Sequence, residues 1–323
     1  MRKLLGRLLL GLISLIGALW IFGPREPVDT NVTFDQVLNP QDLDTYFQTQ
    51  ESKFTDITPG TEKRVIWAGA AGEKTPISVV YIHGFSATSE EIRPVPDRVA
   101  QQLGANLVFT RLTGHGRGGA AMTEPTANDW MNDLAEAIAA GRATGDQVIL
   151  IATSTGGTLA ALAALDPELS QDIKGITFVS PNFQLGNPAA KVLTWPGVRW
   201  WGPLVAGKER SFEPYNDAHA KFWTIRYPSS AVVPMAALVK YMYAQDYSGA
   251  SIPALFVYAP ADKVVSPAAV EDIAARWGGP STLAPQVAGP GDDPNSHVIA
   301  GDILTPGMND AAVQVILSWA QDL

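Results

Sequence analysis

The sequence predicts an α/β protein with a mostly parallel central sheet and helices on both faces of that sheet. Short apolar runs alternate with helix-like stretches from about residue 63 onward. Four of these runs (LVF, VILI, ITFV and LFVY) are almost continuously apolar. Strands that are buried on both faces have this composition, because helices cover each side of a parallel sheet.

The apolar runs place six expected strands along the chain. They cover Arg64–Ala68, Ser78–Ile82, Asn106–Arg111, Gln147–Ala152, Gly175–Ser180 and Ala254–Ala259. The expected helices between and after them are Glu90–Leu103, Ala127–Ala140, Thr155–Leu165, Pro267–Trp277 and Asn309–Gln321. In such a sheet the reacting groups gather at the carboxyl ends of the strands.

Composition excludes several classes of function. The net charge of −9 offers no basic surface to a phosphate backbone, so we expect no nucleic-acid partner. The chain has no cysteine, which excludes thiol catalysis, thiolate zinc sites, iron–sulfur clusters and disulfides. Because it has only four histidines, we expect no histidine-rich metal site.

The first 23 residues have the pattern of a signal or transmembrane segment. Three basic residues, Arg2, Lys3 and Arg7, precede or interrupt an apolar run that ends at Phe22. A helix of roughly 20 apolar residues spans a bilayer, and basic residues favour the cytoplasmic side. We therefore expect a chain that is anchored in the inner membrane and faces the periplasm, or one that is exported. An uncleaved anchor is favoured by the absence of a clear small-x-small cleavage site; the alternative is a buried N-terminal helix.

The remaining domain boundaries follow from composition. Residues 24–50, rich in Pro, Asn and Asp, are expected to form a tether. Residues 51–180 and 252–323 form the expected core, and residues 181–251 an insertion that covers the carboxyl edge of the sheet as a lid. The insertion holds four of the nine Trp and five of the eight Tyr. Its aromatic side chains suit an acyl chain or aryl group, or they form the core of the insertion itself. The side chains concerned are Trp195, Trp200, Trp201, Phe212, Phe222, Trp223, Tyr241 and Tyr243.

The strongest chemical motif is a serine on a strand-to-helix turn. The apolar strand ends at Ala152, and Thr153-Ser154-Thr155-Gly156-Gly157 leads into a helix. Small neighbours are needed where a nucleophilic serine sits on a sharp turn, and the N–H of the next residue then points at a developing oxyanion. The pattern assigns Ser154 as nucleophile and Thr155 as one oxyanion donor. The alternative is that Ser154 only caps the helix.

A second motif follows an earlier strand. Val79–Ile82 runs directly into His83-Gly84-Phe85. In an acyl-transfer site this turn supplies the second oxyanion donor, here the N–H of Phe85, and Gly84 permits the close approach of backbone. His83 is expected to hold the turn rather than to act as the base.

Together with Gly114-His115-Gly116, these ordered motifs resemble the α/β-hydrolase superfamily, and more narrowly its monoacylglycerol lipase and carboxylesterase branch. The resemblance covers about Arg64 to Leu323, with Ala152 in place of the commoner first glycine of the elbow. It implies an α/β-hydrolase fold with a helical lid, no cofactor, and a triad in the chain order serine, acid, histidine.

On this resemblance Asp262, which follows the strand ending at Ala259, is the expected acid, or else a turn residue. His297 is the expected base because it is the only histidine after Asp262. His115 and His219 are the fallback candidates for the base, although His115 is expected to pack in its turn and His219 to lie on the surface of the insertion.

The expected activity is that of a serine carboxylester hydrolase acting on medium-chain or monoacylglycerol-like esters through an acyl-enzyme. Two alternatives stay open: a non-catalytic relative that binds a ligand or partner, and a serine acyltransferase. Few basic residues of the insertion are paired for carboxylate recognition, so ester cleavage is favoured over peptidase activity. The oligomeric state is not predicted.

Overall fold

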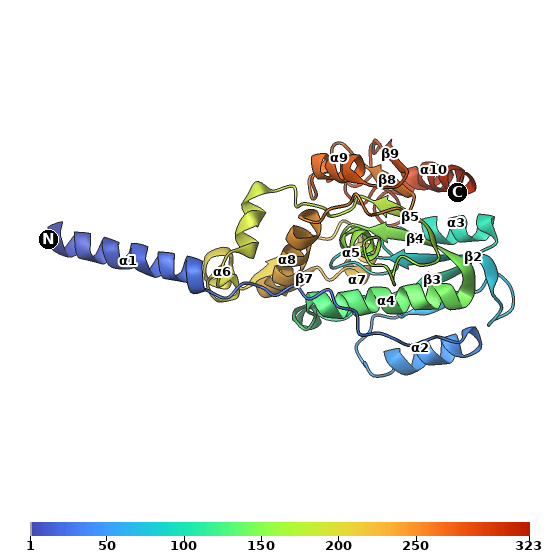
Figure 1. The fold of residues 1–323 in the computed structure, drawn as a ribbon, viewed down its shortest axis with the longest axis horizontal. Coiled ribbons are helices and arrows are strands. Elements are labelled where there is room, and N and C mark those ends of the chain that lie inside the picture. Colours follow the sequence, from blue (N-terminus) through green and yellow to red (C-terminus); the bar gives the residue numbers. More distant parts are fainter. Residues whose placement is uncertain (1) are drawn as a thin grey trace.

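The computed structural model describes residues 2–323, without the side chains at positions 2, 3, 12 and 15; Met1 lies outside the described residues. Its centre is a seven-stranded sheet in the order β1-β3-β2-β4-β5-β8-β9 (Figure 1). β1 pairs antiparallel with β3, and the other neighbours in this sheet are parallel. The strands are β1 (Arg64–Ile66), β2 (Thr75–Ile82), β3 (Asn106–Phe109), β4 (Gly145–Thr153), β5 (Ile173–Val179), β8 (Ala254–Tyr258) and β9 (Ser281–Pro285). The predicted α/β-hydrolase fold with a mostly parallel sheet is confirmed.

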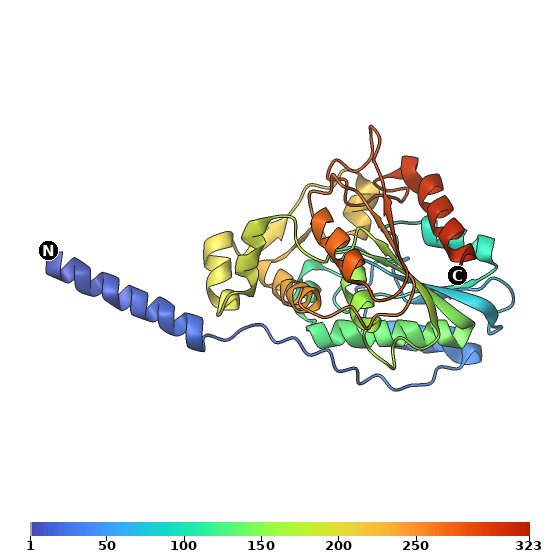
Figure 2. The same ribbon diagram turned by 45° about the horizontal axis from the view of Figure 1, so that its top comes forward.

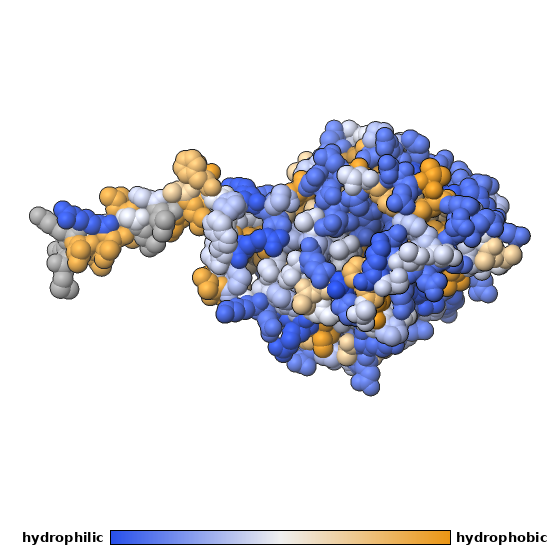
Figure 3. Space-filling model, turned by 90° about the horizontal axis from the view of Figure 1, so that it is seen from below, coloured by the Kyte–Doolittle hydropathy of each residue, from blue (hydrophilic) through white to orange (hydrophobic). Residues whose placement is uncertain are grey.

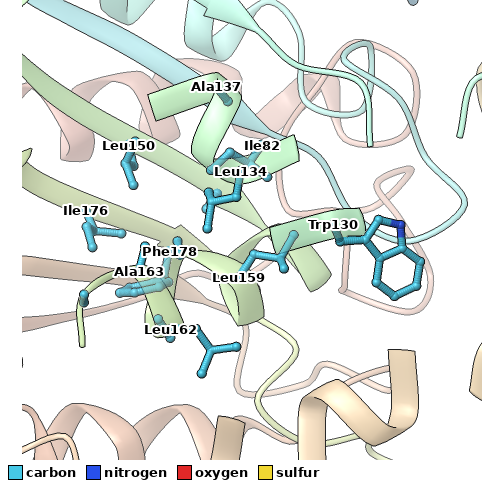
Figure 4. Packing of buried hydrophobic residues seen from close by; sticks show 14 of the residues in the cluster. Ile82, Trp130, Leu134, Ala137, Leu150, Leu159, Leu162, Ala163, Ile176 and Phe178 are labelled. Carbon is cyan, nitrogen blue, oxygen red and sulfur yellow. The ribbon is translucent and has the colours of Figure 1, made fainter. Parts of the chain in front are cut away.

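Helices cover both faces of this sheet. They are α3 (Val95–Leu103), α4 (Ala127–Thr144), α5 (Thr155–Ala163), α9 (Pro267–Arg276) and α10 (Asn309–Gln321). Alternate residues of β2 lie on opposite faces of the sheet. Val80 and Ile82 belong to the core under α4 and α5. Val79 and Tyr81 belong to the core under α3 and α10. Period-two alternation along a strand has this consequence when both faces are buried. Figure 4 shows part of the first core, where side chains of α4 and α5 gather against the strands.

The expected elements are present with shifted boundaries. α3 begins at Val95 rather than Glu90. The ring of Pro94 disfavours helical backbone at the preceding residue, Arg93. β9 was not predicted from the sequence. It is an edge strand in which only Ala284 is buried, so it lacks the apolar run that identified the others.

The segment expected as a tether is packed on the core. The N–H groups of Thr33 and Phe34 each donate to Asn132 Oδ1 of α4, both at 2.8 Å. Helix α2 (Leu43–Glu51) then buries Leu43 and Phe47. Val28, Val32, Phe34 and Leu38 also pack against the core, so residues 24–50 are not a free linker.

Helix α1 (Arg2–Phe22) projects from the body of the molecule (Figures 1 and 2). Leu4–Phe22 is long and apolar enough to cross a membrane, by length and composition, and none of its most apolar window is buried. Figure 3 shows the apolar atoms along this helix beside the largely polar surface of the body. α1 is exposed, so the alternative expectation of a buried N-terminal helix is wrong.

The insertion between β5 and β8 has two parts. Its first part comprises η3 (Pro188–Thr194), α6 (Val198–Ala206), α7 (Asp217–Phe222) and a two-stranded sheet of β6 (Glu209–Ser211) and β7 (Arg226–Pro228). Its second part is α8 (Val232–Tyr243), which packs on α5 and buries Leu238 completely. α8 is therefore part of the core layer, although the sequence placed all of residues 181–251 in a lid.

Candidate active site

Ser154 occupies a sharp turn between β4 and α5. Its backbone has φ 50° and ψ −114°, a left-handed conformation that is rare for a residue with a side chain. The turn is held by two hydrogen bonds: Ser154 N–H donates to the Val179 carbonyl at 3.0 Å, and the Ser154 carbonyl accepts from Asn182 N–H at 2.9 Å. Backbone strain that is fixed in this way is typical of a nucleophile elbow.

The glycines after the serine are required by close contacts. A Cβ on Gly156 would lie 2.3 Å from the carbonyl oxygen of Ile82, and one on Gly157 would lie 2.7 Å from the Cβ of Pro181. Helix α5 can thus approach β2 and the segment after β5 only because both positions lack a side chain.

His297 connects Ser154 to Asp262. Its Nε2 lies 3.1 Å from Ser154 Oγ, and its Nδ1 lies 2.8 Å from Asp262 Oδ2. The three residues come from loops that follow β4, β8 and β9, at the carboxyl edge of the sheet. The structure therefore brings together the serine, acid and histidine that the sequence singled out.

Asp262 is positioned by its own loop. Its Oδ1 accepts the N–H groups of Val264 and Val265 at 2.7 and 3.0 Å, which leaves Oδ2 for His297. The Asp262 side chain is 1% exposed and that of His297 11%. Burial lowers the pKa of His297, but the hydrogen bond to Asp262 and the charge of that carboxylate raise it, and the pKa lies above its ordinary value. Asp262 thus stabilises the imidazolium form of His297.

The loop that carries His297 is ordered by Asp293, a residue that was not predicted from the sequence. Asp293 Oδ2 accepts the N–H groups of His297 and Val298, both at 3.0 Å, and Oδ1 accepts that of Asn295 at 3.0 Å. Asp-Pro-Asn-Ser-His has the composition of an Asx turn, and this was the available signal.

The predicted oxyanion donors lie on the two loops that meet at Ser154. A Cβ on Gly84 would lie 3.0 Å from Ser154 Cβ, so the turn before Phe85 directly faces the serine. Within residues 2–323, neither the Phe85 N–H nor the Thr155 N–H has a hydrogen-bond acceptor. Two backbone donors beside a nucleophile are thus available to a substrate oxygen.

A second buried carboxylate, Glu91, lies behind this loop and was also missed. Glu91 Oε2 accepts from Gly84 N–H at 2.7 Å and from Tyr81 Oη at 3.1 Å, and Tyr81 Oη lies 3.1 Å from Thr153 Oγ1. Burial raises the pKa of Glu91 to about 7. In the sequence Glu91 was included in an expected helix, where a carboxylate is unremarkable.

The other histidines lie outside the triad. His83 is buried, with Nδ1 2.9 Å from the Gly84 carbonyl and Nε2 accepting from Leu112 N–H at 3.1 Å, so it holds its turn as expected. His115 is buried against the ring of Phe85, and burial lowers its pKa to about 4. The expectation that His219 lies on the surface is wrong: it is 4% exposed because Phe212, Tyr215 and Trp223 enclose its ring. No group of three or more His, Asp or Glu side chains in the described part of the chain could hold a metal ion.

The family follows from comparison with known proteins. Residues 74–283 match the sequence profile of the family described as Hydrolase_4, serine aminopeptidase, S33, which covers more than half of the chain. The chain belongs to this family of α/β hydrolases. This S33-family chain resembles monoacylglycerol lipases and esterases.

One curated relative is similar to part of this hydrolase. A thermostable monoacylglycerol lipase of Bacillus sp. (strain H-257) is 31% identical over 104 residues, which are 32% of this chain and 40% of that protein. The match thus spans less than half of the curated relative.

Two solved structures have the same fold at lower identity. One is described as LipS and LipT, two metagenome-derived lipolytic enzymes, with TM-score 0.65, 20% identity, and coverage of 83% of this chain and 100% of that chain. The other is a soluble variant of monoglyceride lipase from Saccharomyces cerevisiae, with TM-score 0.58, 13% identity, and coverage of 93% and 99%. Identities this low support the fold and carry no statement about substrate.

Proposed function

We propose that this hydrolase cleaves carboxylic esters through an acyl-enzyme on Ser154. The observation that carries the proposal is the hydrogen-bonded chain from Ser154 Oγ through His297 to Asp262, on a strained elbow. His297 Nε2 takes the proton of Ser154 as the hydroxyl attacks the ester carbonyl, and then gives a proton to the leaving alcohol. Asp262 holds the imidazole in the tautomer with its proton on Nδ1 and stabilises the imidazolium.

The oxyanion of each tetrahedral intermediate is stabilised by the N–H groups of Phe85 and Thr155. Both lie beside Ser154, and neither is used within the described fold. Deacylation repeats the sequence with water: His297 activates the water, the acyl–Ser154 bond breaks, and the serine regains its proton.

The proposed substrates are medium-chain or monoacylglycerol-like esters. Three known proteins that share sequence or fold with this chain are described as a monoacylglycerol lipase, a monoglyceride lipase and lipolytic enzymes. The aromatic insertion after β5 supports an apolar acyl site, with η3 through β7 as its lid.

We also propose that residues 1–23 anchor the protein in the inner membrane with the hydrolase in the periplasm. The exposed apolar surface of α1 and the basic residue Arg7 near its amino end support this orientation. Extraction of bacterial membranes with carbonate is the test: the full chain stays in the membrane pellet, whereas recovery of an uncleaved chain in the soluble fraction would reject the anchor.

Hydrolysis of p-nitrophenyl esters from acetate to palmitate, together with monoacylglycerols and an aminoacyl anilide, tests the activity. We expect turnover that is greatest at medium chain length and that is lost in Ser154→Ala. Retained esterase activity in Ser154→Ala would contradict the mechanism. Transfer of the acyl group to an added alcohol in preference to water would indicate the acyltransferase, and cleavage of the anilide alone would indicate a peptidase.

A further inference from the structure

The end of α1 is joined to the insertion rather than to the sheet. Gly197 N–H donates to the Pro24 carbonyl at 2.7 Å, and Arg199 forms two hydrogen bonds to the carboxylate of Glu26 at 2.5 and 2.6 Å. The rings of Trp20 and Trp195 meet edge to face with their centroids 5.4 Å apart. These contacts fix the position of the insertion relative to the apolar helix.

A cavity of about 730 Å³ lies at this junction. Its walls come from the end of α1, the segment from Phe183 to Trp195, and α8. The apolar part of the wall includes Phe183, Leu185, Val239 and Tyr243. Ser154, Asp262 and His297 do not line it, so it is separate from the triad.

The rim of this cavity is positively charged. Arg25, Lys191 and Lys240 line it, and no Asp or Glu does among the residues that the structure describes. Among the described side chains, no Asp or Glu forms an ion pair with any of these three cations, although the chain as a whole carries a net charge of −9. Arg25 instead lies over the ring of Trp20, with its Cζ 5.6 Å from the ring centroid. Unpaired like charges around one cavity repel each other, and a bound anion relieves that repulsion.

The junction also lies at the carboxyl end of α1, which would meet the membrane surface if α1 spans the bilayer. α6, which contacts η3 beside the cavity, exposes Trp200, Leu204 and Val205 at 64, 80 and 78%. Figure 1 places α6 at the base of the projecting α1. Aromatic and basic side chains at the end of a membrane helix are typical of the headgroup region, where anionic lipids attract cations.

We propose that this cavity binds the phosphate-bearing headgroup of an anionic phospholipid of the membrane that holds α1. The phosphate lies among Arg25, Lys191 and Lys240, and the first part of the acyl chains lies along the apolar wall. This inference rests on the proposed membrane anchor, and it assigns the junction a role separate from ester cleavage.

Native mass spectrometry of the full chain in a nonionic detergent tests the proposal. The probes are ether-linked phosphatidylglycerol and ether-linked phosphatidylcholine with identical chains, which the proposed esterase cannot cleave. We expect the anionic lipid to be retained on the order of tenfold more strongly than the zwitterionic one. The variant Arg25→Gln/Lys191→Gln/Lys240→Gln loses this preference.

The matched control is Lys53→Gln/Lys74→Gln/Lys174→Gln, which removes the same charge at positions that do not line the cavity. It keeps the preference, and equal melting temperatures of the two triple variants show that both are folded. Three results would each overturn the proposal. They are equal retention of the two lipids, equal loss of the preference for the anionic lipid in both triple variants, and binding of millimolar inorganic phosphate with no lipid retained. If the full chain stays in carbonate-washed membranes while the lipids are retained equally, the anchor stands and the headgroup site is rejected.

Discussion

The carboxylate of Glu91 lies 2.7 Å from the backbone nitrogen of Gly84, on the loop that faces Ser154. Tyr81 Oη connects the same carboxylate to Thr153 Oγ1, the residue before the serine. The elbow and the loop with the proposed oxyanion donor Phe85 are thus joined by one buried polar chain. Such a chain fixes the relative position of nucleophile and oxyanion donors, which electrostatic catalysis requires.

Glu91→Gln tests the electrostatic effect of this carboxylate on the proposed base. The negative charge of Glu91 contributes to the raised pKa of His297. Gln keeps an acceptor for Gly84 but has no charge, so His297 loses its proton at lower pH. Because the pKa of Glu91 is about 7, its charge acts on His297 only near and above that pH. The upper part of the acidic limb of the kcat/KM profile should therefore move to lower pH, whereas the exposed Glu73→Gln leaves it in place. An unchanged limb in Glu91→Gln would show that the carboxylate does not act on the base.

Asp262→Asn tests the role of the acid. The amide cannot stabilise the imidazolium or favour the required tautomer, so kcat should fall by on the order of 10³-fold or more. Because Asp262 raises the pKa of His297, the residual activity should also have its acidic limb at lower pH. The measurement is steady-state kinetics across pH for Asp262→Asn and for the control Asp310→Asn. The side chain of Asp310 is 88% exposed, so the control separates this effect from a general loss of charge. Wild-type kcat in Asp262→Asn would remove Asp262 from the mechanism.

Gly156→Ala tests the close contact under the elbow. The added Cβ would meet the Ile82 carbonyl at 2.3 Å, a backbone atom that cannot rotate away. We expect a loss of about 1–3 kcal/mol in the free energy of unfolding, together with loss of esterase activity as the serine is displaced. Gly118→Ala, where a Cβ has no neighbour within 4 Å, is the matched control in urea unfolding. Equal stabilities of the two variants would mean that the turn relaxes freely.

Glu51→Ala tests whether α2 belongs to the folded core. Glu51 pairs with Arg111 through two hydrogen bonds of 2.7 and 2.9 Å, and their side chains are 8 and 3% exposed. Removing one partner leaves a buried charge, so we expect a loss of about 3–5 kcal/mol in urea unfolding. Glu209→Ala breaks an exposed pair with Arg226 and should cost about 1 kcal/mol or less. Similar small losses in both would indicate that α2 is only loosely attached.

The sequence predicted the parts of the fold that have strong local signals. The apolar runs of β4 and β8 and the small residues around Ser154 are visible without a structure, because burial on both faces and a tight turn each restrict residue type. β9 was missed because an exposed edge strand imposes no such restriction.

The candidate site was predictable only in part for the same reason. Ser154, Asp262 and His297 follow recognisable turns, and the structure brings them together. Glu91 contacts Gly84, and Asp293 contacts the loop that carries His297. These contacts form only in the folded chain, so the local sequence of each residue gives at most a turn signal. The packing of residues 24–50 on α4 likewise depends on contacts about 100 positions away along the chain.

Labelling by a fluorophosphonate, followed by intact-mass and peptide mass spectrometry, tests directly whether Ser154 is an activated nucleophile. We expect one phosphonyl group per chain, bonded to Ser154 Oγ with loss of fluoride, and no label in Ser154→Ala. Slow labelling is expected in His297→Gln, because the serine then lacks its base. An unlabelled wild-type chain, or a label that persists in Ser154→Ala, would contradict the assignment of Ser154 as the activated nucleophile.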